Sequence, residues 1–343
     1  MEAVKTEFKL YSPKGGIQAL YIGGGTPTIL PANDLESLFV YFQANGKFAE
    51  GAEITCEGSP ETLSREKIDL LSRHATRASI GVQSFEDEIL REVGRRHTAL
   101  QAEEKIREVM GSISFLNIDL MFGLPHQTLE HWFHSLKIAL ELSPQSISTY
   151  RFSMRPGCSY APHYSGDELG FAHEQLARLM YLTGREILGN AGYEEKPWMY
   201  FVKPGFGPQA FEERWGKRSL YLGLGVNSYS ASKDYLAVNI EDRRAYTSAV
   251  LGGSLPIEKS MRLNEWNKAI QLIWGVFKSG SSLELSELER FGEEIFSSAI
   301  AALGNLAERG LVLIANSCAS LTEAGSALME WIPRELQAAI KQR

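Results

Sequence analysis

The segment Tyr21–Thr28 reads YIGGGTPT and marks a change from a strand to a helix. The apolar run Ala19–Ile22 is typical of a buried strand, and three consecutive glycines end it. Apolar residues then recur at helical spacing over Leu35–Phe42, with Asn33 or Asp34 as the N-cap. The sequence therefore predicts a strand–turn–helix unit, the building block of α/β folds.

The same alternation of strand and helix continues over residues 18–152. It predicts a parallel sheet covered by helices, either closed as a barrel or open and doubly wound, and the pattern alone leaves that choice open. The predicted strands are residues 19–22, 53–57, 77–82, 115–121 and 146–150, and the predicted helices are 35–42, 64–72, 86–93, 102–110 and 128–140.

The second half of the chain is less regular. We predict a helix over Gln175–Leu188, a strand followed by a turn over Tyr221–Ser230, and a helix over Ile300–Arg309 that Gly310 ends. A hairpin of residues 311–314 and 320–322 follows, and this order is typical of a small winged-helix-like α+β domain. The predicted domains are 1–160, 161–260 and 261–343.

Composition narrows the class of protein. The chain has 343 residues, 44% hydrophobic and 22% charged, and its net charge of −7 argues against a nucleic-acid surface. No apolar run reaches the roughly 18–20 residues of a membrane helix, and the N-terminus lacks a signal-peptide pattern. Cys56, Cys158 and Cys318 are too far apart for a metal-ligand spacing or a disulfide framework, so we expect a cytoplasmic protein.

Polar or glycine residues stand at the carboxyl ends of four predicted strands, where parallel α/β sheets bind ligands. The glycines of Gly23–Gly25 let a backbone approach a small zwitterion closely, or they form only a tight turn. Glu57 lies on the same strand face as Glu53 and Thr55. It is interpreted as a ligand-binding carboxylate, a helix cap or a surface charge.

Further polar side chains belong to the same part of the chain. Gln83 ends a strand, and its amide both donates and accepts hydrogen bonds. Asp119 lies in an otherwise apolar strand, where a structural partner or a cationic ligand must neutralise it. Arg95 suits bidentate binding of a carboxylate, although two adjacent arginines are usually solvated. His131 and His134 form HxxH on a helix without a third ligand nearby, so we interpret them as surface residues.

Six motifs resemble one family in their order along the chain. They are YIGGGTPT, EITCEGSP, SIGVQSFED, GRRH, NIDLMFGLPHQT and YLGLGVNS, and they are similar to segments of the oxygen-independent coproporphyrinogen III oxidase family of radical S-adenosylmethionine (SAM) enzymes. That family includes heme chaperones, heme-degrading methyltransferases and natural-product methyltransferases or cyclopropanases. The resemblance extends to ERGL and LTEAG near the C-terminus. It implies a partial (β/α)6 barrel, here without its first strand.

The resemblance also implies SAM-binding residues, although it assigns no catalytic acid or base in this chain. Gly24 and Glu57 are expected to contact the SAM that is cleaved. The residues expected around a second SAM are Gly25, Thr26, Gln83, Arg95 and Asp119, with Tyr229 beside it. The chemistry agrees, because a guanidinium suits the methionine carboxylate and Asp119 suits an ammonium group or ribose hydroxyls.

The cysteines depart from the family pattern. Family members carry CxxxCxxC, whose thiolates bind a [4Fe–4S] cluster, and electrons from a donor such as flavodoxin then cleave SAM to a 5′-deoxyadenosyl radical. This sequence contains no CxxxC or CxxC, and Cys56 lies in a predicted strand. We interpret residues 2–11 as the end of the helix that follows the cluster loop. The first strand and that loop are therefore expected to be missing, through a misassigned start or trimming, and the chain as written is expected to bind no cluster.

Three hypotheses for function follow. One is a radical SAM oxidoreductase or methyltransferase that decarboxylates or methylates a porphyrin or another small substrate once the missing segment is restored. The others are a heme-binding chaperone and a cluster-free pseudoenzyme or interaction protein. Many porphyrin enzymes of the family have a Tyr-Glu pair and an Asn near the part of the chain around Gly192. Here it reads GYEEKPW over Gly192–Trp198 and then Gly207-Pro208-Gln209, which we interpret as weakening coproporphyrinogen as the substrate.

Overall fold

The computed structural model describes residues 1–13, 15–153, 171–196, 199–207 and 220–341. The chain forms two compact units. Residues 17–40 and 48–208 form one, here called the sheet unit; residues 1–16, 41–47 and 209–343 form the other, the terminal unit. Cys158, the predicted domain boundary at residue 160, Pro197-Trp198 of GYEEKPW and Pro208-Gln209 lie outside the described residues.

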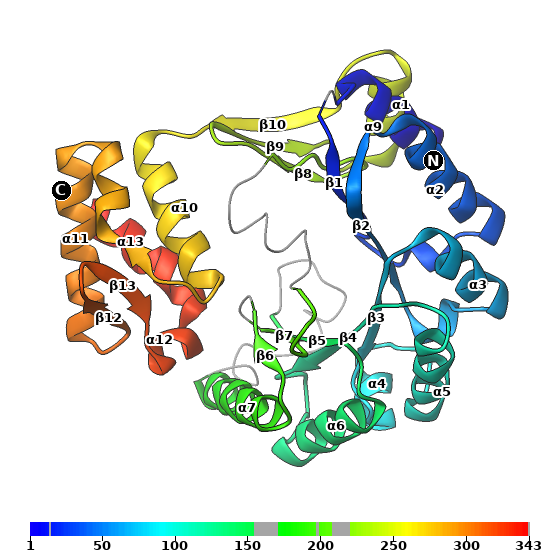
Figure 1. The fold of residues 1–343 in the computed structure, drawn as a ribbon, viewed down its shortest axis with the longest axis horizontal. Coiled ribbons are helices and arrows are strands. Elements are labelled where there is room, and N and C mark those ends of the chain that lie inside the picture. The colour runs from blue at the N-terminus through cyan, green and yellow to red at the C-terminus, as the bar shows by residue number, and fades with distance from the viewer. Residues whose placement is uncertain (14, 154–170, 197–198, 208–219, 342–343) are drawn as a thin grey trace. The chain divides into compact units, whose positions relative to one another are not determined.

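The sheet unit contains a seven-stranded sheet in the order β1-β2-β3-β4-β5-β7-β6. Strands β1 to β5 run parallel, and helices α3 to α6 lie along the outer side of this curved row (Figure 1). The predicted α/β fold with a parallel sheet is confirmed. The strands are β1 (Ile17–Ile22), β2 (Phe48–Gly58), β3 (Arg77–Gln83), β4 (Leu116–Phe122), β5 (Ser146–Arg151), β6 (Glu194–Glu195) and β7 (Tyr200–Val202). The helices are α2 (Ala32–Asn45), α3 (Arg65–His74), α4 (Asp87–Glu92), α5 (Ala99–Met110), α6 (Leu129–Leu142) and α7 (Phe171–Asn190), with short 3-10 turns η1 (Pro27–Ile29) and η2 (Pro60–Thr62).

Side chains alternate between the two faces of this sheet. In β3, Ile80 and Val82 have no exposed surface, whereas the residues between and before them point to the opposite face. The strand register pairs Glu57 with Ser79 and Gly81 with Asp119. One face of the sheet therefore packs apolar side chains, and the other gathers polar groups from neighbouring strands.

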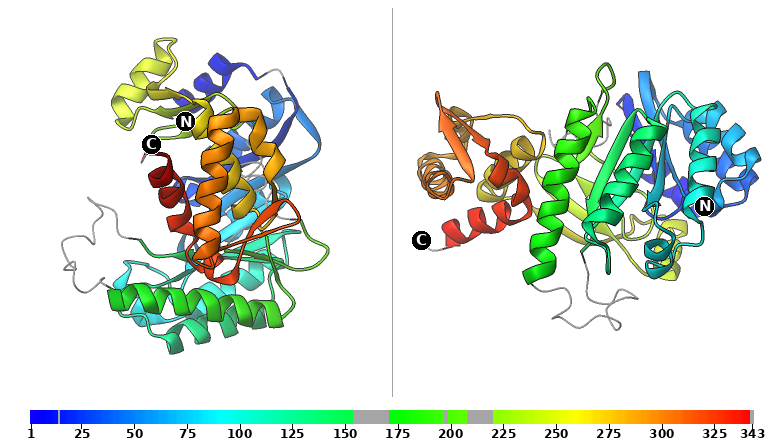
Figure 2. Two further views of the ribbon diagram at one scale, coloured as in Figure 1. Left: turned by 90° about the vertical axis from the view of Figure 1, so that its left-hand side faces the viewer. Right: turned by 90° about the horizontal axis from the view of Figure 1, so that it is seen from below.

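Helices α6 and α7 pack against each other (Figure 2). One buried indole lies between them. The Trp132 ring has no exposed surface, and its N–H donates to the carbonyl of Met180 at 2.8 Å. A Cβ at Gly184 would lie only 3.0 Å from that ring. The absence of a side chain at Gly184 thus permits the close packing of the two helices.

The terminal unit begins with α1 (Glu2–Tyr11), which packs against α9 (Arg243–Leu251). A three-stranded antiparallel sheet in the order β10-β9-β8 belongs to the same unit. Its strands are β8 (Tyr229–Ala231), β9 (Tyr235–Asn239) and β10 (Ile257–Arg262). The fully buried Glu7 links these parts, because it bonds to Gly225, Asn239 and Tyr246.

The predicted strand followed by a turn over Tyr221–Ser230 is wrong in its order. The region begins with a single bridge from Tyr221 to Ala231, then turns, and only then enters β8. A Cβ on Gly223 would lie 2.1 Å from the carbonyl oxygen of Tyr229. The chain folds back on itself so closely at this glycine that no regular strand forms before the turn.

The last part of the terminal unit combines helices with a small hairpin (Figure 2). The predicted hairpin is present as β12 (Val312–Ala315) and β13 (Cys318–Leu321), and β11 (Leu283–Glu284) adds a third strand. The other elements are α10 (Glu265–Lys278), η3 (Leu285–Phe291), α11 (Glu293–Glu308), α12 (Glu323–Ala327), η4 (Met329–Trp331) and α13 (Ile332–Lys341). Across the described residues, no helix has the length and apolar character required to cross a membrane.

Candidate functional site

The glycine loop after β1 is shaped by close contacts and by backbone conformation. A Cβ on Gly23 would lie 2.4 Å from the Tyr21 ring and 2.6 Å from the carboxyl carbon of Glu57. Gly24 has a φ of +85°, which is unfavourable for residues with a side chain. Nothing lies within 4 Å of a Cβ on Gly25. The first two glycines are therefore required for different reasons, whereas the third faces open space.

Glu57 ends β2 and is held by β1 and the glycine loop. The Tyr21 hydroxyl donates to Oε1 at 2.5 Å, and the amide of Gly24 donates to Oε2 at 3.2 Å. The amide of Gly25 also hydrogen-bonds the carboxylate. Burial raises the pKa of Glu57, and these hydrogen bonds offset the effect only in part. A cationic ligand would stabilise a carboxylate in this state.

Gln83 ends β3 in a strained conformation that the sequence does not reveal. Its φ is 73°, in the left-handed region, and the register between β3 and β4 shifts between Gly81 and Gln83. Its side-chain amide makes no hydrogen bond to any described residue. Such strain at a strand end is common where a side chain is aimed at a ligand, so Gln83 is a candidate binding residue.

Asp119 lies in a polar cluster on one face of β3 to β5. Asn117 donates to its Oδ1 at 2.7 Å, and the Ser79 hydroxyl lies 3.2 Å from Oδ2. Burial and the negative charge of Glu57 raise the pKa of Asp119 to about 6. The two carboxylates thus oppose each other's ionisation, and a cation bound near both would relieve that repulsion.

Arg77 supplies a buried positive charge to the same face. Its Nη2 donates to Ser146 at 3.1 Å and also to the Tyr200 hydroxyl, and its guanidinium lies 4.1 Å from the centre of the Phe115 ring. Its Nε and Nη1 have no partner in the described part of the chain. Arg77 lowers the pKa of Asp119, although burial and Glu57 prevail.

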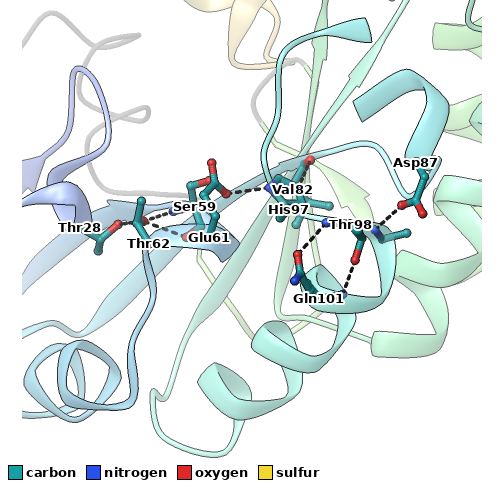
Figure 3. Close-up of polar contacts among 10 residues, drawn as sticks. Thr28, Ser59, Glu61, Thr62, Val82, Asp87, His97, Thr98 and Gln101 are labelled. Carbon is teal, nitrogen blue, oxygen red and sulfur yellow. Dashed lines mark hydrogen bonds and ion pairs between the residues drawn. The ribbon is translucent and has the colours of Figure 1, made fainter. Parts of the chain in front are cut away.

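The GRRH motif is fixed by its histidine (Figure 3). His97 is buried; its Nδ1 lies 2.7 Å from Glu61 Oε2, and its Nε2 lies 3.2 Å from the carbonyl of Val82. The Glu61 carboxylate and the Val82 carbonyl are both hydrogen-bond acceptors. Burial acts to raise the pKa of Glu61, but hydrogen bonds from Ser59, its own backbone and His97 prevail and lower it. His97 thus ties the start of α5 to η2 and β3, next to Arg95.

The remaining predicted site residues are Arg95, Thr26 and Tyr229, and the last of these lies in the terminal unit. Arg95 is half-buried and makes no ion pair with another described residue. Thr26 precedes η1, and its carbonyl accepts from the amide of Ile29 at 2.9 Å. Tyr229 belongs to β8 of the terminal unit, where its side chain is 55% exposed. The structure brings Glu57, Gly24 and Gly25 into contact and couples Glu57 electrostatically to Asp119.

Three residues of this polar face were not predicted from the sequence, namely Tyr21, Arg77 and Ser79. A signal was present, because Arg77, Ser79, Gly81 and Gln83 alternate with apolar residues along one strand. The HxxH pair is not part of this face. His131 pairs with Glu88 at 2.8 Å, and His134 pairs with Glu86 at 2.7 Å.

Comparison with known proteins defines the class. A model described as the radical SAM superfamily matches residues 1–139. The fold is similar to coproporphyrinogen III oxidase (HemN) from Escherichia coli, described as a radical SAM enzyme, with a TM-score of 0.83 and 24% identity over 98% of this chain and 82% of that one. The sheet unit is therefore a radical SAM fold.

Two curated relatives narrow the family. The heme chaperone HemW of Haemophilus influenzae is 32% identical over 232 residues, which cover 67% of this chain and 59% of that protein. The oxygen-independent coproporphyrinogen III oxidase of Paracoccus denitrificans is 32% identical over 263 residues, which cover 71% and 56%. The chain thus spans less than two thirds of each relative. Across these matches it resembles the coproporphyrinogen III oxidase-like radical SAM proteins.

The described cysteines do not fit the [4Fe–4S] cluster that the superfamily implies. Cys56 is completely buried in β2, and burial raises the pKa of its thiol to about 12, which opposes the thiolate form that binds iron. Cys318 belongs to β13 of the terminal unit. Among the residues with described positions, no three His, Cys, Asp or Glu side chains are arranged to hold a metal ion. We therefore assign no chemical step to a cluster.

Proposed function

We propose that this chain binds SAM at the carboxyl ends of β1 to β4. We also propose that it binds heme or a related porphyrin, either to transfer it or to modify it. The observation that carries the proposal is Glu57, whose pKa is raised by burial although Tyr21 and two glycine amides bond to its carboxylate. SAM carries an ammonium and a sulfonium group, and both cations favour an ionised carboxylate. Membership of the radical SAM superfamily supports SAM as the ligand.

The site residues would divide between two SAM molecules. Glu57 and the backbone of Gly24 suit the ammonium group of the first. Asp119 suits the ammonium group or ribose hydroxyls of the second, and Arg95 suits its carboxylate, since a guanidinium binds carboxylates with two hydrogen bonds. Gly25, Thr26 and Gln83 complete the second site.

Binding of heme for transfer is one form that this function could take. The Haemophilus influenzae relative is named a heme chaperone, which supports the same role here.

A second candidate is radical modification of a porphyrin. The Paracoccus denitrificans relative, named a coproporphyrinogen III oxidase, favours this candidate. Both candidates share the SAM site but differ in whether SAM is consumed. Iron and sulfide analysis of anaerobically purified protein separates them. About four irons together with SAM turnover would favour the enzyme, whereas hemin binding without turnover would favour the chaperone.

Equilibrium dialysis with radiolabelled SAM tests the SAM site directly. The substitution Glu57→Gln keeps the shape of the side chain but removes its charge, so we expect SAM affinity to fall about tenfold or more, since a hydrogen bond to a charged group contributes about 1.5–3 kcal/mol. The matched control is Glu53→Gln on the same strand, which should retain the wild-type affinity. Equal affinities for Glu57→Gln and wild type would refute the assignment of this carboxylate.

A further inference from the structure

A hollow lies entirely within the terminal unit, between the β8–β10 sheet and α10. Its volume is about 490 Å³. This size falls in the range of roughly 300–1,000 Å³ that is typical of small-molecule pockets. None of the residues that line it was predicted as a binding residue except Tyr229. The predicted SAM sites therefore do not account for this hollow.

The floor of this hollow is one face of the three-stranded sheet. The register sets Tyr229 beside Val238 and Val238 beside Lys259, in one row across β8, β9 and β10. The next row on the same face contains Ala231, Leu236 and Met261. The floor is thus a flat apolar surface with a phenol at one side and an ammonium at the other.

The opposite wall is one face of α10. Gln271, Trp274, Gly275 and Lys278 line the hollow at positions i, i+3, i+4 and i+7, which fall on one side of a helix. Trp274 therefore faces the apolar floor. A flat ring between the floor and the indole would contact apolar surface on both of its faces.

The charged groups that line the hollow have one sign. Among the described residues that line the hollow, Lys259 and Lys278 are the charged ones, and the lining includes no Asp or Glu. Lys259 lies on the exposed strand β10 and makes no ion pair with a described residue. In a protein with a net charge of −7, this local pair of lysines favours an anionic ligand.

We infer that this hollow binds a planar tetrapyrrole, with its ring between the sheet floor and Trp274 and its propionate groups on Lys259 and Lys278. The inference rests on the proposed function and adds the location of the ligand. Heme and an iron-free porphyrin share this chemistry. Met261 and Tyr229 also line the hollow, and a thioether or a phenol can ligate heme iron.

Titration of the full chain with hemin and, separately, with coproporphyrin III tests the inference. Absorbance reports hemin binding, and porphyrin fluorescence reports the iron-free ligand. We expect one ligand per chain for the wild type and a loss of affinity of about tenfold for Lys259→Glu and for Lys278→Gln. Trp274→Ala should weaken binding to a similar extent, whereas Trp274→Phe should recover most of it.

The control is Lys47→Glu, an exposed lysine of the same unit outside the hollow. It makes the same change in net charge as Lys259→Glu and should leave both affinities unchanged. Lys259→Arg should also bind like the wild type, and circular dichroism verifies that each variant is folded. A preference for coproporphyrin over hemin would still support the site and would indicate a porphyrin rather than heme as its ligand.

Two results would overturn the inference in distinguishable ways. Wild-type affinity in Lys259→Glu, Lys278→Gln and Trp274→Ala would place the tetrapyrrole elsewhere and leave the proposed heme function intact. No binding of either ligand by the wild type would remove both the site and the heme part of the proposed function, while the SAM dialysis would stand independently.

Discussion

Two carboxylates, one in each unit, both accept hydrogen bonds and both have a pKa that burial raises, but their neighbours differ. Glu7 of the terminal unit has no exposed surface and accepts bonds from Gly225 at 2.8 Å, Asn239 at 2.6 Å and Tyr246 at 2.5 Å. Burial raises the pKa of Glu7, and no second carboxylate adds to this shift. Its hydrogen bonds join α1 to distant parts of the unit, so its role is structural.

Glu57 of the sheet unit shares its surroundings with another acid. The charge of Glu57 contributes to the raised pKa of Asp119, and the amide of Gln83 on the neighbouring strand makes no hydrogen bond to a described residue. These groups become more stable when a cation or a polar ligand arrives. Burial alone therefore does not mark a binding site. A second acid close by, together with an unused donor, is the better indicator.

The largest expected effect is on the structural carboxylate. Replacement Glu7→Ala removes the acceptor of the Tyr246 hydroxyl and of the Gly225 amide, whereas Asn239 keeps acceptors at Gly225 and Ser228. Each unsatisfied group costs about 1–3 kcal/mol, so we expect the free energy of unfolding to fall by about 2–5 kcal/mol. Urea denaturation measures this change. SAM affinity of the folded fraction should stay unchanged, because Glu7 does not belong to the sheet unit.

The control for this substitution is Glu2→Ala on the same helix. Glu2 forms an i,i+3 pair with Lys5 and its side chain is 80% exposed. Its removal should change the free energy of unfolding by less than about 0.5 kcal/mol. A small effect of Glu7→Ala on stability with a large effect on SAM binding would reverse the comparison.

Asp119→Asn should have effects of opposite sign on stability and binding. Because folding raises the pKa of Asp119 from 3.8 to about 6, wild-type stability falls as pH rises through this interval. The variant lacks this loss, so at pH 7.5 we expect it to be more stable by about 1–3 kcal/mol. Urea denaturation at several pH values measures the difference.

The same group should make SAM binding depend on pH. Ionised Asp119 attracts the cationic ligand, so the wild-type affinity should rise as pH increases through about 6. Asp119→Asn should bind about tenfold more weakly at pH 7.5 and show no such rise. A variant that is less stable and binds SAM normally would make Asp119 a structural residue like Glu7.

Gly23→Ala tests the fit of the loop around Glu57. Its Cβ would overlap the Tyr21 ring and the Glu57 carboxyl group, and overpacking of this kind costs about 1–3 kcal/mol. The paired control is Gly25→Ala, which meets nothing within 4 Å and should leave stability within about 0.5 kcal/mol of wild type. Thermal denaturation ranks the two variants, and equal effects would show that the loop tolerates side chains throughout.

The smallest expected effect concerns the hydrogen-bonded pair of His97 and Glu61, which lies next to Arg95. His97→Gln removes one partner of a buried pair with Glu61, and we expect a loss of about 1–2 kcal/mol in the free energy of unfolding at pH 7. Because the folded protein lowers the pKa of Glu61, the stability that this pair provides is lost as pH falls below about 4.5.

His134→Gln is the matched control for the His97–Glu61 pair. His134 also pairs with a glutamate, at 2.7 Å, but its side chain is 51% exposed. The change in stability should therefore stay below about 0.5 kcal/mol. Equal losses in the two variants would show that burial of His97 adds nothing.

Much of the sheet unit was predictable because its signals are local. The glycine run after Ile22 and the apolar repeats between strands predict βα units, and parallel strands bring their carboxyl ends to one edge. Glu57 and its contact with the glycine loop follow from that geometry. The left-handed backbone of Gln83 was not predictable, since glutamine usually avoids this conformation and only the surrounding sheet imposes it.

The motifs and apolar repeats of the sequence were enough to predict the resemblance to radical SAM proteins, the parallel sheet and the edge of that sheet at which polar residues gather. The partners of each acid became known only from the three-dimensional structure, because they include donors that are distant in the chain. Glu7 meets Asn239 and Tyr246 across more than two hundred residues of chain, and Lys259 meets the hollow through strand register. Contacts of this kind depend on packing between elements, which no local pattern of residues encodes.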